Sequence, residues 1–253
     1  MVYDLQKANM WKRVSAWMFD LILTAVLAIG IGVLLSGLLG YDQTSRQLNE
    51  IYDTYGTQYG VDFDISQSDY QTLSQEQLQR YEAATDAMNA DAQAVEVFNR
   101  LVRLSLLVTT LGIFFGILVW EFFIPLKLGD GQTLGKKVFG LCLMRSDKVK
   151  VNNLQLFTRA VIGKFAIETM IPVFIVMMIF WGTMGLGGTL ILLGLLIAQC
   201  VSVIATQTNS ALHDLMAATV VVDRNSQMIF KTPEDLIEYQ KQVAADLAAR
   251  ATY

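Results

Sequence analysis

The sequence has little of what a soluble protein uses. Only 17% of its 253 residues are charged, against about 25% in soluble domains. The two cysteines, Cys142 and Cys200, suggest no disulfide framework, and a single histidine, His213, argues against a His/Cys metal site. No nucleophile motif, catalytic triad or cofactor fingerprint is present, so we predict neither an enzyme nor a bound cofactor or metal. The net charge of −4 also argues against a nucleic-acid partner.

What the sequence does have is long uncharged runs. There are 21 uncharged residues between Asp20 and Asp42, and 44 in a row from Thr169 to Leu212. A membrane span needs about 20 apolar residues, so the second run is long enough to cross twice, with a break at the glycines between Gly182 and Gly188. We predict four spans, at residues 17–40, 102–123, 165–183 and 188–210. The predicted fold class is therefore all-α. We expect a polytopic membrane protein with a four-helix transmembrane bundle that contacts the lipid bilayer.

The charges of the loops predict the orientation. Residues 42–100 carry eleven acidic residues and three arginines, whereas residues 121–164 carry eight Lys/Arg and three acidic residues. Because basic loops stay in the cytosol, residues 42–100 are expected outside and both termini inside. Lys7, Lys12 and Arg13 before the first span agree. That apolar stretch is longer than a signal peptide core and no cleavage site follows, so we expect it to be retained.

Three further segments are expected around the spans. Residues 42–100 form an acidic extracytoplasmic helical hairpin with a capping box at Ser74 to Gln77; it is either a spacer or a lid or docking element. In the cytosolic loop, residues 141–144 and 149–151 flank a turn and predict a β-hairpin, and residues 154–164 predict an amphipathic interfacial helix. Residues 225–253 form a cytosolic tail with an amphipathic helix starting at Pro233.

Charged residues within the ends of the spans need an explanation, since a charge in the membrane is costly. Asp20 begins a row of small or polar residues that includes Thr24 and Ala28 and allows close helix packing. Arg13 lies about 10 Å earlier along the helix axis, so each of the two is expected to find a partner on another helix. The alternative is that Asp20 lies at the level of the lipid headgroups.

Four more titratable residues lie at the same cytosolic level. Glu168 precedes Pro172, which leaves the Glu168 carbonyl without its usual helical donor, so a carboxylate and a free carbonyl occur together as in a cation or proton site. His213 can carry protons near neutral pH. The candidate ion- or proton-binding residues are Asp20, Glu121, Glu168, His213 and Asp214, with Arg13 as their charge partner. The structural alternative is an Arg–carboxylate network that fixes the bundle.

The basic segment that starts at Gly131 fails as a phosphate-binding loop. Gly131-Gln-Thr-Leu-Gly135-Lys136-Lys137 lacks the four-residue gap between its glycines and the Ser/Thr after the lysine. We expect a turn with Lys136 and Lys137 against anionic lipid headgroups.

Three segments resemble the RDD family of bacterial membrane proteins. They are Arg13-Val-Ser-Ala-Trp-Met-Phe-Asp20, the Gly131 segment continuing through Val-Phe-Gly140-Leu, and Leu212-His213-Asp214-Leu-Met-Ala-Ala-Thr219-Val-Val. The resemblance covers residues 8–41 and 101–224, which together predict an RDD-like transmembrane domain of residues 8–224 with the acidic segment 42–100 as an insertion within it. It implies that Arg13, Asp20 and Asp214 are the residues for which the family is named. It also implies a bacterial cytoplasmic membrane location and transport, with cation/proton exchange proposed for some members.

Two functions therefore stay open. The first is a small transporter that exchanges a monovalent cation for a proton, as a homo-oligomer because four spans are few for a transport path. The second is a non-transporting scaffold or adaptor, in which the Arg/Asp residues fix the bundle and the outer hairpin or the tail binds partners. A polar vestibule lined by Asp20 and Asp214 would favour the first, and a dry, fully paired network the second.

Overall fold

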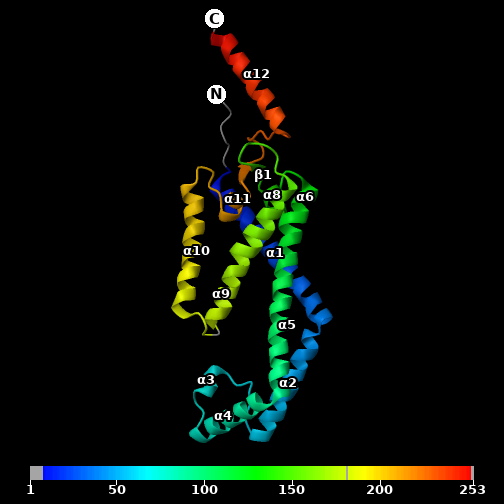
Figure 1. Cartoon of the computed structure of the whole chain (residues 1–253), viewed down its shortest axis with the longest axis vertical. Coiled ribbons are helices and arrows are strands. Elements are labelled where there is room, and N and C mark those ends of the chain that lie inside the picture. Colours follow the sequence, from blue (N-terminus) through cyan, green and yellow to red (C-terminus); the bar gives the residue numbers. More distant parts are fainter. Residues whose placement is uncertain (1–7, 181, 252–253) are drawn as a thin grey trace. The chain divides into compact units, whose positions relative to one another are not determined.

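Four long apolar helices dominate the structure. It is a computed structural model that describes residues 8–180 and 182–251 and is mostly helical (Figure 1). The candidate membrane spans are Met10–Leu39, Ala92–Leu128, Asn153–Phe180 and Gly185–Ala205. The predicted helical fold with four spans is confirmed, although each of the four spans begins earlier than expected. Lys7, one of the basic residues used for the orientation, lies outside the described residues.

The chain divides into two compact units, which we describe separately. One contains Ile29–Gly112, and the other contains the residues up to Ala28 together with those from Ile113 onwards. Helix α1 (Met10–Leu39) and helix α5 (Ala92–Ile117) each contribute to both units. The insertion predicted at residues 42–100 therefore forms one unit with the adjoining halves of the first two spans.

The unit formed by Ile29–Gly112 contains the expected helical hairpin. Gly40, with a positive φ of 77°, separates α1 from α2 (Tyr41–Tyr59). The short α3 (Gln67–Tyr70) follows, and then α4 (Gln75–Ala90). The capping box between Ser74 and Gln77 is present at the start of α4. Phe63 in the loop between α2 and α3 packs its ring against Tyr52 and Tyr81, with centroids 5.4 and 5.2 Å away, and joins α2 to α4.

The other unit holds the remaining helices. Helix α5 continues into η1 (Leu118–Phe123) and α6 (Ile124–Leu128), and α7 (Leu134–Val138) follows. The third span consists of α8 (Asn153–Phe157), η2 (Thr158–Met170) and α9 (Ile171–Phe180). The chain then reverses into α10 (Gly185–Ala205), followed by α11 (Leu212–Met216) and α12 (Pro233–Ala251). Gly182, with φ 70°, makes the predicted break.

Two segments of the spans, η1 and η2, are π-helices. In a π-helix each N–H bonds to a carbonyl five residues earlier, which widens the turn. The N–H of Ile171 follows this pattern and bonds to the carbonyl of Ala166. Pro172 comes next and has neither an N–H for an α-helical bond nor room for the carbonyl four residues before it. A wider turn before Pro172 is consistent with that restriction.

A two-stranded antiparallel sheet lies beside α11 and α8 (Figure 1). Strand β1 (Leu141–Arg145) pairs with β2 (Thr219–Asp223), in a register that places Leu143 opposite Val221. The predicted hairpin is wrong in its main partner. Residues 149–150 do return to β1, but only through a bridge between Met144 and Lys150. The valines of β2 suit this place better, because both faces of β1 are buried and β-branched side chains pack well against cross-strand neighbours.

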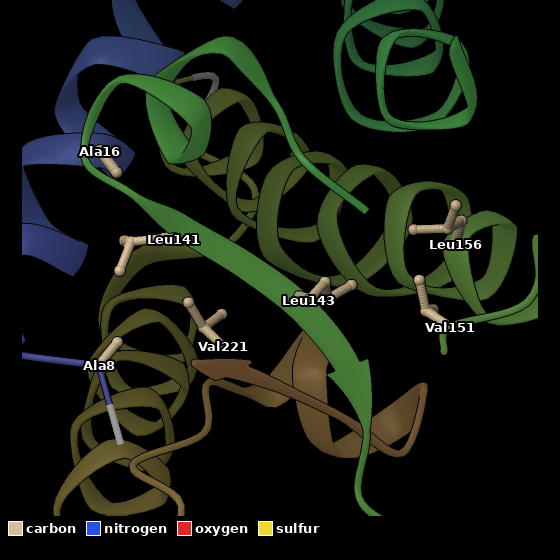
Figure 2. Close-up of a cluster of buried hydrophobic side chains, with 7 residues drawn as sticks. All are labelled: Ala8, Ala16, Leu141, Leu143, Val151, Leu156 and Val221. Carbon is tan, nitrogen blue, oxygen red and sulfur yellow. The ribbon is translucent and has the colours of Figure 1, made fainter. Parts of the chain in front are cut away.

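Both faces of the sheet are buried. Successive side chains of a strand point to opposite sides, so those of β1 enter two separate apolar clusters. On one face Leu141 and Leu143 pack with Val221, against Ala16 of α1 and Leu156 of α8, as Figure 2 shows. On the other face a second cluster forms, which consists of Cys142, Met144, Val220 and Val222 with Ile229. The sheet thus fixes the beginnings of the first and third spans to the segment after the fourth.

Small residues allow α1 and α5 to approach closely. A Cβ placed on Gly116 would lie 2.8 Å from the Cβ of Ala28, closer than carbon atoms pack. Ala28 belongs to the row of small residues that starts at Asp20, so the packing role predicted for this row is confirmed at this crossing.

Candidate functional site

Arg159 of η2 lies at the centre of a buried group of charges. Its side chain is only 4% exposed, and it donates three hydrogen bonds to residues of two other elements. Nε bonds to Asp214 Oδ1 at 2.8 Å, and Nη1 bonds to Glu121 Oε2 at 3.0 Å. Nη2 lies 2.9 Å from Nε2 of His213. One guanidinium therefore joins the second span, the third span and α11, because its planar fork offers several donors at once.

Three basic side chains surround the carboxylate of Glu121 in η1. Besides Arg159, Lys164 of η2 donates a hydrogen bond to Glu121 Oε1, and Lys136 of α7 lies 3.8 Å from Oε2. The residue is 4% exposed. Three cations around one buried carboxylate offset the cost of its burial.

Asp214 of α11 is held by two arginines. Arg13 of α1 reaches Asp214 Oδ2 at 3.6 Å and also donates to the carbonyl of Thr208 at 3.3 Å, while Arg159 binds the other carboxylate oxygen. Arg13 was predicted to pair with a residue of another helix and not with Asp20 of its own helix. This prediction is confirmed.

His213 and Glu168 form the next pair. Nδ1 of His213 lies 2.8 Å from both carboxylate oxygens of Glu168, and the backbone N–H of His213 donates to Oε1 at 3.1 Å. The Glu168 carboxylate is thus bound by His213 of α11, and its predicted role as an ion- or proton-binding residue stays a prediction.

Asp20 of α1 is bound only by neutral donors. Trp120 Nε1 donates to Oδ1 at 3.0 Å and the Gly135 N–H donates to the same oxygen at 2.8 Å, while the Thr133 hydroxyl donates to Oδ2. Asp20 is 4% exposed, so it is enclosed by protein and does not lie free among headgroups. Gly135 has to be small, since a Cβ there would lie 2.8 Å from Asp20 Cγ.

Lys136 links Asp20 to the rest. Its Nζ lies 3.3 Å from the Thr133 hydroxyl that binds Asp20, and it approaches Glu121 on the other side. We call the whole set the charge network. It consists of Arg13, Asp20, Glu121, Lys136, Arg159, Lys164, Glu168, His213 and Asp214. Every one of these residues belongs to the same unit.

The π-helical turn of η2 decides which of its side chains meet. Arg159 and Glu168 are nine residues apart, and at about 100° per residue an α-helix would place them about 180° apart. With about 4.4 residues per turn in a π-helix, nine residues make about two full turns, and both side chains reach His213. Gly163 lies between them, and a Cβ there would lie 2.5 Å from the Cβ of His213. Glycine therefore lets α11 approach η2.

Burial changes the acidity of the groups outside the spans. The pKa of Lys136 is lowered to about 8, chiefly by burial and then by the nearby charge of Arg159, while Glu121 acts in the opposite direction. Burial also lowers the pKa of His213, with Asp214 opposing this effect and Arg159 adding to it. For Asp214 burial acts to raise the pKa, but the basic groups around it, Arg159 and Arg13 among them, hold it below its usual range. Burial raises the pKa of the Cys142 thiol to about 12.

The structure thus brings together the residues singled out in the sequence. Asp20, Glu121, Glu168, His213, Asp214 and Arg13 all belong to the charge network. The lipid role predicted for Lys136 is wrong, because its side chain is 7% exposed and lies inside the network. Lys137 is exposed, and its contact with lipid stays a prediction.

Several contributing residues were missed in the sequence. Arg159 had been placed on an interfacial amphipathic helix, and Trp120 and Thr133 carried no signal. Charge balance could have pointed to Arg159, because the candidates at the cytosolic ends of the spans were four carboxylates (Asp20, Glu121, Glu168 and Asp214) and one arginine, Arg13. The interfacial placement of Arg159 is wrong, because the residue is only 3% exposed and lies inside the charge network.

The fold and the charge network define a multi-pass membrane protein with four candidate spans, joined at one end by buried ion pairs. The RDD family model matches residues 7–218, and the chain belongs to the RDD family. Comparisons with curated proteins and with solved structures gave no match.

Proposed function

We propose that this protein is a small transporter that exchanges a monovalent cation for a proton, with Asp20 as the cation-binding carboxylate. The observation that carries the proposal is a pair of cavities, of about 620 and 450 Å³, that share part of the charge network as lining. Both lie within one unit of the chain. The shared lining residues are Trp17, Asp20, Lys164, Glu168 and Gln199.

The two cavities extend in different directions from that shared lining. The larger one follows the apolar part of the spans and reaches Ala28, Ile113 and Pro172. The smaller one reaches His213 and Val221, near the sheet. A solute that passed from one to the other would meet Asp20, which is the arrangement that access from two sides of a binding residue requires.

Asp20 suits a cation better than the other carboxylates do. Among the described residues it forms no ion pair, whereas Glu121 and Asp214 are each paired with at least two cations. A cation at Asp20 would therefore not have to displace a lysine or an arginine. Hydroxyl and carbonyl oxygens, such as that of Thr133, are the further ligands that such ions prefer.

Charge balance suggests why cation and proton would exclude each other. Four carboxylates (Asp20, Glu121, Glu168 and Asp214) face four cations (Arg13, Lys136, Arg159 and Lys164), so the charge network is neutral when His213 is neutral. A bound cation or a bound proton adds one positive charge in a poorly solvated region. Adding both is more costly than adding either, which favours exchange over symport.

The test is a flux assay in proteoliposomes with an acidic interior. Addition of Na⁺ or K⁺ outside should raise the internal pH, measured with a trapped dye, and Asp20→Asn should abolish this rise while the protein still elutes as a folded species. The matched control is Asp147→Asn, because Asp147 is an exposed aspartate with a single arginine partner, and it should exchange normally. If folded wild-type protein moves no proton with any monovalent cation, the proposal is wrong.

One observation favours the alternative, a scaffold or adaptor without transport. Among the described residues no buried side-chain nitrogen or oxygen lacks a hydrogen-bond partner, as expected of a network that fixes a bundle. This alternative predicts that Asp20→Asn lowers the yield of folded protein and that neither form shows flux.

The proposal includes the cellular arrangement. We place the protein in the bacterial cytoplasmic membrane with both termini in the cytosol and residues 42–100 outside, on the strength of the lysines and arginines in residues 121–164. We also propose a homo-oligomer, since four spans provide few helices to enclose a path.

A further inference from the structure

The hydrogen bonds of His213 determine where its ring proton lies. Nε2 lies 2.9 Å from Nη2 of Arg159, and Nδ1 lies 2.8 Å from both carboxylate oxygens of Glu168. A guanidinium carries only donors. Nε2 must therefore accept from Arg159 with its lone pair, which leaves Nδ1 to carry the proton and donate to Glu168.

This arrangement makes one atom the place where a proton would arrive. We propose that Nε2 of His213 is the proton-accepting atom of the charge network, and that its protonation breaks the Arg159–His213 hydrogen bond. A hydronium ion gives its proton to Nε2 and is released as water, and the lone pair that accepted the Arg159 Nη2 hydrogen bond now forms the Nε2–H bond. Two donors then face each other at a distance where they repel, so the imidazolium ring and the Arg159 guanidinium must move apart.

The groups around His213 determine how much its protonation costs. From η2, Glu168 favours the imidazolium, whereas Arg159 and Lys164 oppose it. Asp214 on α11 favours it, with its Oδ1 3.6 Å from Nε2, and Arg13 of α1 lies beyond Asp214. Glu121 of η1 holds Arg159 from the far side. Because Arg159 stays bound to Asp214 and Glu121, proton binding at His213 would redistribute the ion pairs without dissolving them.

This assignment goes beyond the proposed function and does not require it. A proton-linked rearrangement of Arg159 would serve a scaffold as a pH sensor as well as it would serve an exchanger. For the exchanger it names the proton site, separate from the cation carboxylate Asp20. The flux assay tests cation/proton exchange through Asp20, whereas spectroscopy of the His213 ring tests the proton site.

The experiment uses the fact that His213 is the only histidine of the chain. Full-length protein with ¹⁵N-labelled histidine, purified through a tag without histidine and reconstituted in bilayers, gives the signal of one imidazole. At pH 7.5 we expect a protonated Nδ1 and an unprotonated Nε2, which is the opposite of the tautomer that a solvent-exposed histidine prefers. An Nε2–H tautomer or an imidazolium at this pH would overturn the proposal.

A pH titration of the same signal tests the role of Arg159. Nε2 should become protonated with a midpoint below about 6.5, the ordinary histidine value. In Arg159→Gln the midpoint should rise by about one pH unit or more, because a like charge has been removed. Arg145→Gln, which changes an arginine outside the network, should leave it unchanged.

A second variant keeps the test decisive if Arg159→Gln does not fold. Glu168→Gln retains an acceptor for the Nδ1 proton, so the tautomer should persist while the midpoint falls, since the attraction of the carboxylate is lost. A midpoint that stays at the wild-type value in the folded Glu168→Gln protein would contradict the proposed site.

Discussion

Arg159 illustrates what a single buried side chain does in this protein. It is the common partner of Asp214, Glu121 and His213, and removing it would leave two carboxylates with fewer cations in a poorly solvated place. Breaking a buried ion pair from one side typically costs about 3–5 kcal/mol.

We therefore predict that Arg159→Met lowers the free energy of unfolding by roughly 3–5 kcal/mol. The measurement is a denaturant titration in detergent micelles, followed by tryptophan fluorescence. Arg145→Met is the control, because Arg145 pairs with Asp147 near the surface, and it should cost less than about 1 kcal/mol. A loss for Arg159→Met as small as that of the control would show that the network contributes little to stability.

The lowered pKa of Lys136 predicts that the stability of the protein changes with pH in the alkaline range. Its pKa is lowered to about 8 in the folded protein, chiefly by burial, whereas the unfolded chain titrates near the ordinary lysine value of about 10.4. Between these values the unfolded state binds more protons, so stability rises with pH.

The expected result is a gain of a few °C in Tm between pH 8 and pH 10 that depends on Lys136. Lys136→Met should remove this gain, so the difference between the two proteins isolates Lys136 from tyrosines and other groups that titrate in the same range. Parallel Tm curves for the two proteins over this range would contradict the assignment.

At the scale of the elements, the two π-helical segments contribute four of the nine residues of the charge network. Glu121 lies in η1, and Arg159, Lys164 and Glu168 lie in η2. Pro172 and Gly163 contribute by different means: the proline is incompatible with an α-helical bond to Glu168, and the glycine leaves room for His213. The site thus depends on a helix geometry that a period of 3.6 residues does not describe.

We predict that Gly163→Ala separates η2 from α11, because the new methyl group would lie 2.5 Å from the Cβ of His213. Overpacking of this kind typically costs about 1–3 kcal/mol, measured in the same denaturant titration. Gly194→Ala is the matched control, since a Cβ at Gly194 meets no atom within 4 Å, and its unfolding should be unchanged or slightly stabilised. Equal stability of the two variants would mean that α11 does not pack as closely as the structure shows.

At the scale of the whole molecule, the orientation in the membrane is the main prediction. Ala83 of α4 and Ser146 of the turn after β1 are both exposed, and the positive-inside rule places them on opposite sides of the bilayer. In a background without Cys142 and Cys200, a thiol reagent that cannot cross membranes should label Ala83→Cys in intact cells, and Ser146→Cys only after permeabilisation. The reverse pattern would invert the topology.

Several features follow from the sequence because they depend on local properties. Long uncharged runs predicted the four spans, Gly182 the reversal between the last two, and Ser74 with Gln77 the capped start of α4. Span length, helix caps and glycine turns each involve a few neighbouring residues, so they can be recognised without knowledge of the rest of the fold. The placement of Asp20, Glu121 and Glu168 at one level followed in the same way, from their distance along each span.

Only the tertiary structure decided which of these groups touch. The partner of β1 is β2, more than 70 positions along the chain, and the partners of Arg159 lie on η1 and α11. Such contacts depend on how the helices pack and, in η2, on a change of helical period. The sequence by itself determined that charges would gather at the ends of four spans, because burial and length are local. Their assembly around Arg159, with Asp20 held apart by neutral donors, is a property of the packed structure, because ion pairs are set by distances between segments far apart in the chain.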